Sequence, residues 1–229
     1  MTDMLGLLVL AFVLGMRHAT DVDHLAAVTT IVSQRRSAWS AALVGALWGL
    51  GHTTSLVAAA IAVIALHTQI PPRVEHGLEM GVAIMLIGLG INLLRTLGRG
   101  GALHLHPHRH GGGRDHVHPH RHAPGERTAP HHHEPAIGRR PFWVGLVHGL
   151  AGSAALMLTV AATIPSARLA FGYVLVFGFG SVGGMMVMSV LLGGPMAWVV
   201  HRFAHAEWAL SGLAALGSVT VGVAMVLGG

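Results

Sequence analysis

The sequence predicts an all-α integral membrane protein with six transmembrane helices, arranged as two inverted repeats of three helices each. Its 229 residues have a mean hydropathy of +0.62 and only 10% charged side chains, which is too apolar for a soluble domain. The apolar residues gather in stretches that mostly reach the roughly 20 residues needed to cross a bilayer as a helix. The short alternating segments of a membrane β-barrel are absent from the sequence.

Six apolar spans follow one another along the chain, at residues 4–32, 39–66, 75–94, 141–163, 168–192 and 206–228. The first two are longer than a bilayer requires, which indicates either a tilted helix or a helix that breaks at polar residues. Three pairs of glycines with i, i+4 spacing predict close helix packing in lipid: Gly45/Gly49, Gly145/Gly149 and Gly180/Gly184.

The two halves of the chain, residues 1–97 and 141–229, resemble each other at three places. The matches are Gly15–His18 with Gly145–His148, Gly49–His52 with Gly178–Ser181, and Glu75 with Glu207. Their offsets are 130, 129 and 132 residues. Because a unit of three spans reverses its direction in the membrane, the matches predict inverted repeats with a substrate site at their interface, near the midplane.

Residues 98–140 interrupt the apolar pattern and separate the two halves. This segment is rich in His, Pro, Gly and Arg and has no period that builds a core, so we expect a disordered loop. It is either a low-complexity linker or an accessory chelator of divalent metal. Eleven of the nineteen histidines are its candidate ligands: His104, His106, His108, His110, His116, His118, His120, His122, His131, His132 and His133.

The basic charge predicts orientation rather than a nucleic-acid partner. All 14 basic residues are arginine, and eleven of them lie in or beside the first, third and fifth loops. Only Arg73 and Arg168 lie in loops on the opposite side. By the positive-inside rule, both termini face outward and the His-rich loop faces the cytoplasm of a bacterial-type cell, with the chain in its cytoplasmic membrane.

A polar segment within the first span holds His18, Asp21, Asp23 and His24. An ionised side chain at mid-membrane costs about 2.5–3.5 kcal/mol on insertion scales, so the segment must face the protein interior and bind something. Imidazole and carboxylate donors suit nickel, cobalt or zinc, and the chain has no cysteine to supply a thiolate.

On an ideal helix, His18, Asp21 and His24 share one face and Asp23 points away from it. Asp23 therefore either holds an imidazole through a hydrogen bond, or binds metal directly where the helix is unwound.

Two further histidines complete the predicted metal site. His52 lies at mid-span depth, and His148 is the repeat counterpart of His18, although a single buried histidine is often only a structural hydrogen-bonding residue. The predicted ligands are His18, Asp21, Asp23, His24, His52 and His148. The metalloprotease pattern H-E-x-x-H is absent, and we predict no catalytic residue, no enzyme activity and no resident cofactor.

Two motifs of this site resemble the signatures of the nickel/cobalt transporter family. RHATDVDHLAAV matches the family's H-x4-D-H signature through His18, Asp23 and His24, and LGHTT matches its second histidine motif through His52. The resemblance implies transport of Ni²⁺ or Co²⁺, as substrate, across the cytoplasmic membrane, with the signature helix essential for recognition. In the fourth span, GLVHGLAGSAAL lacks the acidic motif of the larger members. It resembles the shorter urease accessory permeases and, more distantly, the sulfite-exporter-like superfamily.

The sequence thus predicts a metal permease, with nickel uptake as the expected activity. The expected partners are the metal ion, the lipid bilayer, a cytoplasmic nickel acceptor or urease accessory proteins, and further copies of the chain in a homo-oligomer. One alternative is a nickel or cobalt exporter, because His-rich cytoplasmic loops also resemble those of efflux proteins. Another is a sulfite-exporter-like anion transporter, for which Arg17 is the single mid-span candidate.

Overall fold

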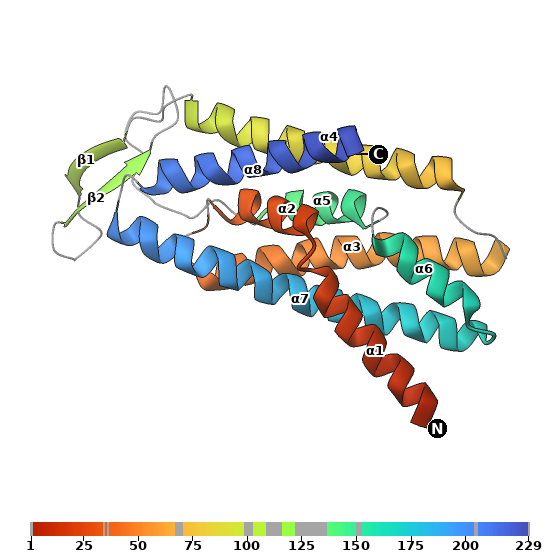
Figure 1. Ribbon diagram of the computed structural model, residues 1–229. Helices are drawn as coiled ribbons and strands as arrows, with labels where there is room; N and C mark the ends of the chain where they lie inside the picture. Colours follow the sequence, from red (N-terminus) through yellow and green to blue (C-terminus); the bar gives the residue numbers. More distant parts are fainter. Residues whose placement is uncertain are drawn as a thin grey trace.

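The computed structural model describes residues 2–33, 35, 37–66, 71–98, 103–108, 116–121, 137–149, 153–203 and 206–228. These residues form eight helices and two strands (Figure 1). Their bounds are α1 Thr2–His18, α2 Val22–Val32, α3 Ala38–Leu66, α4 Pro72–Gly98, β1 Leu103–His108, β2 His116–Arg121, α5 Arg140–His148, α6 Ser153–Thr163, α7 Ala167–Arg202 and α8 Ala206–Gly228.

The first apolar span is broken at its polar segment, which was one of the two possibilities left open by its length. Helix α1 ends at His18, α2 begins at Val22, and their axes differ in direction by 56°. The backbone N–H of Asp21 donates to the carbonyl of His18 (3.1 Å), and Asp21 itself is extended at the N-terminal end of α2. The break therefore places two helix ends among polar side chains in the middle of the span.

Four helices, α3, α4, α7 and α8, are each long and apolar enough to cross a membrane, and the bent pair α1–α2 gives a fifth candidate span. Helices α3 and α8 agree with their predicted spans to within one residue, whereas α4 and α7 extend further at their ends. The predicted fourth span, 141–163, consists of two short helices, α5 and α6. The chain is a multi-pass membrane protein.

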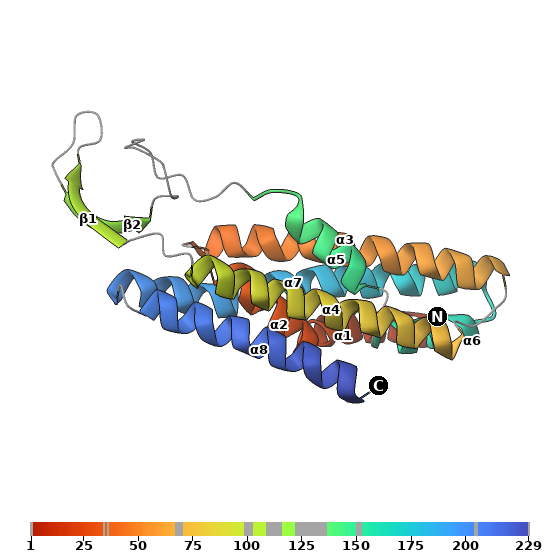
Figure 2. The ribbon, with the colours of Figure 1, turned by 90° about the horizontal axis from the view of Figure 1, so that it is seen from above.

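The helices are arranged around two long pairs (Figures 1 and 2). Helix α3 packs along α7, and α4 packs along α8. The short helices α2 and α5 lie between the two pairs, while α1 and α6 lie at one end of the α3–α7 pair. Buried apolar residues of α2, α3, α4 and α7 form the main core, and large apolar side chains such as Ile61, Ile84 and Phe179 face outward, as lipid contact requires.

Glycines set the spacing between the helices. A Cβ atom on Gly15 of α1 would collide with the carbonyl oxygen of Phe177 in α7. In the same way, a Cβ atom on Gly145 of α5 would collide with the carbonyl oxygen of Trp48 in α3. All three predicted glycine pairs lie at such contacts: Gly45 and Gly49 against α7, Gly145 and Gly149 against α3, and Gly180 and Gly184 against α1.

The segment predicted to be disordered contains a two-stranded antiparallel ladder, in which His104 pairs with His120 and His106 with His118. In both strands histidine alternates with other residues, which matches the two-residue period of a strand. Three consecutive glycines, 111–113, separate the two strands in the sequence.

We expect Gly15→Ala to destabilise the bundle by about 1–3 kcal/mol, because the methyl group must push α1 away from the α7 backbone. The matched control is Gly88→Ala in α4, where a Cβ atom would meet no other atom within 4 Å. Alanine has a better helix propensity than glycine, by at most about 1 kcal/mol, so the Gly88→Ala variant should be at least as stable as the parent protein. Thermal unfolding of the two purified variants measures the difference, and equal loss of stability in both would contradict the packing argument.

Candidate metal centre

Four helices bring their polar residues to one place in the membrane-spanning bundle. His18 is the last residue of α1, Asp23 and His24 lie in the first turn of α2, His52 lies in the middle of α3, and His148 is the last residue of α5. All four imidazoles are buried. Residues of four helices that lie far apart in the sequence therefore meet in one cluster.

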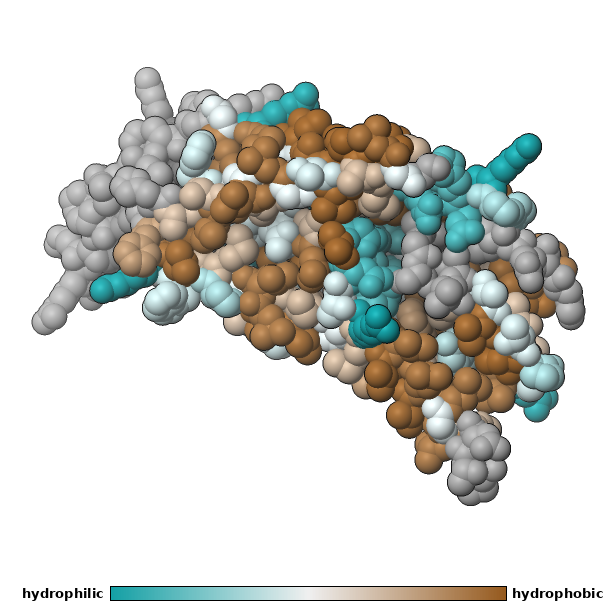
Figure 3. Space-filling model, viewed as in Figure 1, coloured by the Kyte–Doolittle hydropathy of each residue, from teal (hydrophilic) through white to brown (hydrophobic). Residues whose placement is uncertain are grey.

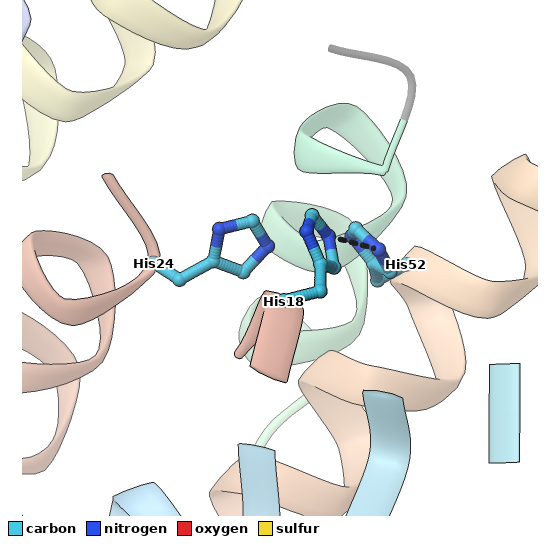
Figure 4. Close-up of side chains that lie close together, drawn as sticks. All are labelled: His18, His24 and His52. Carbon is cyan, nitrogen blue, oxygen red and sulfur yellow. Dashed lines mark hydrogen bonds between the residues drawn. The ribbon is translucent and has the colours of Figure 1, made fainter. Parts of the chain in front are cut away.

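One part of the cluster consists of His18, His24 and His52, whose ligand atoms lie within 4.8 Å of one another. The Nε2 atoms of His18 and His52 are 3.0 Å apart, and the ring centres of His18 and His24 are 4.3 Å apart. Figure 4 shows His18 between the other two rings, with the ring of His24 directed toward it. Two imidazole nitrogens that each lie about 2.1 Å from one metal ion, at right angles, stand about 3.0 Å apart, so this spacing fits a shared ion.

The other part consists of Asp23, His24 and His148, whose ligand atoms also lie within 4.8 Å of one another. Oδ1 of Asp23 accepts a hydrogen bond from Nδ1 of His24 (3.2 Å), and Oδ2 accepts one from Nε2 of His148 (2.7 Å). His24 thus belongs to both groups, with one ring nitrogen in each.

The two carboxylates determine which ring nitrogens are free to bind a cation. An ionised carboxylate only accepts, so the hydrogen of a neutral ring lies on the nitrogen that contacts it. Nδ1 of His18 donates to Oδ2 of Asp21 (3.0 Å), as Nδ1 of His24 does to Asp23. The lone pairs of these two rings are therefore on Nε2, and Nε2 of His24 is buried without a hydrogen-bond partner among the described residues.

Helix ends add to the attraction for a cation. The carbonyl ends of α1 and α5, at His18 and His148, both lie at the cluster, and a helix C-terminus carries partial negative charge. The N-terminus of α2 has the opposite sign, and Asp21 and Asp23 at that end offset it.

Close helix approach makes the cluster possible. A Cβ atom on Gly149, which follows His148, would collide with the carbonyl oxygen of His52 and the hydroxyl of Ser55. A Cβ atom on Gly51, next to His52, would collide with the backbone of α5 at Phe142. Small residues on both helices therefore let α5 approach α3 closely enough to place His148 in the cluster.

Aromatic rings enclose the imidazoles. The ring of Trp48 lies 5.4 Å from that of His24 and 5.7 Å from that of His148, and Phe177 lies 5.6 Å from His18. Neither aromatic residue was predicted from the sequence to belong to the site. For Trp48 a signal existed, because it precedes His52 by four residues and so shares its helix face.

A cavity of about 230 Å³ leads to the cluster. It is lined by Leu14, Arg17, His18, Asp21, Met157, Val160, Tyr173 and Phe177, from α1, the α1–α2 break, α6 and α7. Figure 3 shows a hydrophilic patch in the middle of an otherwise apolar face, near the junction of α1 and α2. The cavity reaches His18, and neither Asp23 nor His148 lines it.

The structure brings five of the six predicted ligands together and places the sixth, Asp21, at the edge of the cluster. The side chain of Asp21 is 40% exposed and that of Asp23 is 18% exposed. Of the two geometries that the sequence left open for this segment, the structure has the unwound one, because α1 ends at His18 and α2 begins at Val22.

The predicted loop ligands are not placed by the structure. His104, His106, His108, His116, His118 and His120 lie on strands of which only the backbone is described, and His110, His122, His131, His132 and His133 lie outside the described residues.

The chain is similar in sequence to several known proteins. The chain is 34% identical to the urease accessory protein UreH of Bacillus sp. (strain TB-90), over 84% of this chain and 78% of that protein. It is 33% identical to a high-affinity nickel transport protein of Cupriavidus necator, over 35% of this chain and 23% of that protein. Chloroplast protein FOR GROWTH AND FERTILITY 2 of Arabidopsis thaliana is 24% identical over 90% of this chain and 51% of its own length.

No solved structure matches the chain. Residues 4–138, which include the break between α1 and α2 and both histidine motifs, match the NicO family model, described as high-affinity nickel-transport protein. This match covers more than half of the chain, and the relative UreH is matched over most of its length. The chain belongs to the NicO family of high-affinity nickel-transport proteins.

Proposed function

We propose that this chain is a permease that takes up Ni²⁺, or Co²⁺, across the cytoplasmic membrane through the His/Asp cluster at the α1–α2 break. The observation that carries the proposal is the cluster itself, in which four buried imidazoles and one carboxylate lie within a bundle of apolar helices. Polar groups at this depth are costly unless they serve an ion pathway. The metal is the substrate, and the chain acts as a transporter rather than as an enzyme.

The donor atoms favour nickel and cobalt. The cluster offers nitrogen and carboxylate oxygen, and the absence of cysteine from the chain removes the thiolates that soft metals prefer. The names of the relatives from Cupriavidus necator and Bacillus point the same way, toward nickel transport and urease assembly.

Two inverted repeats, 1–97 and 141–229, are the architecture we propose for this transport. Reciprocal glycine contacts support it: Gly90 of α4 meets the backbone of Ala215 in α8, and Gly222 of α8 meets that of Ala83 in α4. The offset between Gly90 and Gly222 and between Ala83 and Ala215 is the same 132 residues that relates Glu75 to Glu207. On this scheme α5 and α6 together form the fourth span, just as α1 and α2 together form the first.

The two halves differ near the ends of α2 and α6, where a gate to the cluster would lie. Thr30 of α2 is buried, and its hydroxyl, which donates to the carbonyl of Ala26 (2.8 Å), lies 3.4 Å from the carbonyl oxygen of Ala214 in α8. Its repeat counterpart, Val160 of α6, is 37% exposed and lines the cavity. The first half is thus packed against α8 at Thr30, whereas the second half is open to the cavity at Val160. This difference supports transport by a rocking motion of the two halves about the cluster.

The arginine distribution supports an orientation with both termini outside and residues 98–140 in the cytoplasm. The cavity then lies on the outer side of the cluster, where an ion taken up from outside would enter. In this orientation the His-rich loop receives metal after it crosses the membrane and passes it to a cytoplasmic nickel acceptor or to urease accessory proteins, a role suggested by the name of the relative UreH. A homo-oligomer is the assembly we propose.

Accumulation of radioactive nickel in cells that express the protein tests the proposal. We expect uptake above cells carrying the empty vector, and a return to the vector level with His18→Ala, since that change removes the imidazole of the cluster that lines the cavity. The matched control is His76→Ala, an exposed histidine of α4 outside the cluster, which should transport normally.

Two other results would contradict nickel uptake. Accumulation below the vector level that His18→Ala restores would identify an exporter. No change in either direction, with the protein present in the membrane, would exclude nickel as the substrate.

A further inference from the structure

We propose that the cluster contains two overlapping metal stations that share His24 and are occupied in turn. The first station is His18, His24 and His52, and the second station is Asp23, His24 and His148. The proposal rests on the metal being the transported substrate, and it adds an order of steps and separate roles for individual ligands.

The chemistry of His24 makes the two stations mutually exclusive. Its Nδ1 contacts Asp23 in the second station, and its Nε2 is unpartnered and buried on the side of His18. A neutral imidazole has a lone pair on only one nitrogen, because the other nitrogen carries the hydrogen. One ring therefore binds one ion at a time, through Nε2 in the first station or through Nδ1 in the second.

The handover balances without a net proton. When the ion moves from the first station to the second, the hydrogen of His24 shifts from Nδ1 to Nε2, so the ring is neutral before and after. The hydrogen that Nε2 of His148 donates to Asp23 likewise shifts to Nδ1 of that ring, which is buried without a hydrogen-bond partner among the described residues, so that Nε2 can bind the ion. The ion exchanges the nitrogens of His18 and His52 for a carboxylate oxygen of Asp23 and a nitrogen of His148. Asp23 accordingly has two roles, first as the acceptor that orients His24 and then as a ligand.

The cavity determines the order of occupation. It is lined by His18 of the first station and by Asp21, which orients His18, whereas Asp23 and His148 do not line it. His148 lies at the end of α5, packed beside Trp48 and the α3 backbone. An ion that arrives through the cavity thus meets the first station first and reaches His148 last.

The test separates binding from transport. Binding is measured in a full-length background in which the eleven loop histidines are replaced by serine, so that the loop does not bind the probe, and transport is measured in the protein with its natural loop. Ni²⁺ binding to the purified protein is measured by calorimetry, and the coordination of the bound ion by X-ray absorption. The variants are His148→Ala and His18→Ala, which remove corresponding residues of the two halves, and the control is His76→Ala.

We expect the background protein to bind one Ni²⁺ per chain. His148→Ala should retain this binding within about threefold, with an unchanged number of imidazole ligands, while nickel transport falls at least ~10-fold. His18→Ala should lose both binding and transport, and His76→Ala neither.

Loss of binding in His148→Ala, equal to that in His18→Ala, would overturn the proposal in favour of a single four-histidine site. His148→Gln, which still offers a donor to Asp23, shows whether such a loss comes from unfolding, because a folded His148→Gln protein that does not bind nickel would also indicate a single site. Two nickel ions bound to one chain at the same time, or full transport by His148→Ala, would also overturn the proposal. If the background protein binds nickel but the protein with its natural loop does not transport it, the result would instead refute the proposed function.

Discussion

Replacement of His24 with alanine is expected to reduce nickel transport to the level of cells without the protein. His24 is the residue common to both groups of ligand atoms, and its ring contacts those of His18, His52 and His148. Its removal leaves each group with two ligands and takes one hydrogen-bond donor from Asp23. No neighbouring side chain can supply the missing nitrogen, because the rings around it are held by other helices.

The measurement is initial-rate uptake of radioactive nickel, with the amount of protein in the membrane determined in parallel. His76→Ala again provides the matched control on an exposed site. A His24→Ala protein that is folded, present in the membrane and transports at more than about a tenth of the parental rate would exclude a central role for this ring.

Asp23→Asn is expected to lower nickel transport about 100-fold, whereas Asp21→Asn should lower it only about 10-fold. Asp23 accepts hydrogen bonds from two buried rings and is largely shielded from solvent, so its charge compensates a metal ion in a region of low dielectric. Asp21 orients His18 from the cavity wall, where solvent screens its charge and water can replace its carboxylate.

The asparagine side chain has nearly the same size as aspartate, so this comparison isolates charge and hydrogen-bond acceptance from packing. The difference is measured from the uptake rate of both variants as a function of nickel concentration. An effect of Asp21→Asn as large as that of Asp23→Asn would contradict the separate roles of the two residues, because the exposed carboxylate would then matter as much to the ion as the buried one.

The sequence alone was sufficient for much of the local structure. Apolar length predicted α3 and α8 to within one residue, because a helix in lipid must satisfy all of its backbone hydrogen bonds internally and therefore spans the whole apolar stretch. Composition also identified His18, Asp23, His24 and His52 as candidate ligands, since polar residues inside an apolar span are rare and costly.

Geometry within the first span could not be predicted in the same way. Rotation by 100° per residue placed Asp21 with His18 and His24, but this rule holds only while the helix continues. Packing against α7 and α8 stabilises α1 and α2 in directions 56° apart, and three residues between them lose the helical period. Asp23 consequently lies in the cluster and Asp21 at the cavity.

The amino-acid sequence by itself determined the membrane class, the position of the apolar spans and the types of ligand available, because these depend on local composition and on helix length. Only the tertiary structure decided which ligands meet, how two carboxylates direct the free nitrogens of the imidazoles, and which of them the cavity reaches. Those properties depend on contacts between residues far apart in the sequence, such as Asp23 and His148, which are 125 positions apart. Close glycine packing between helices brings such residues within hydrogen-bond distance.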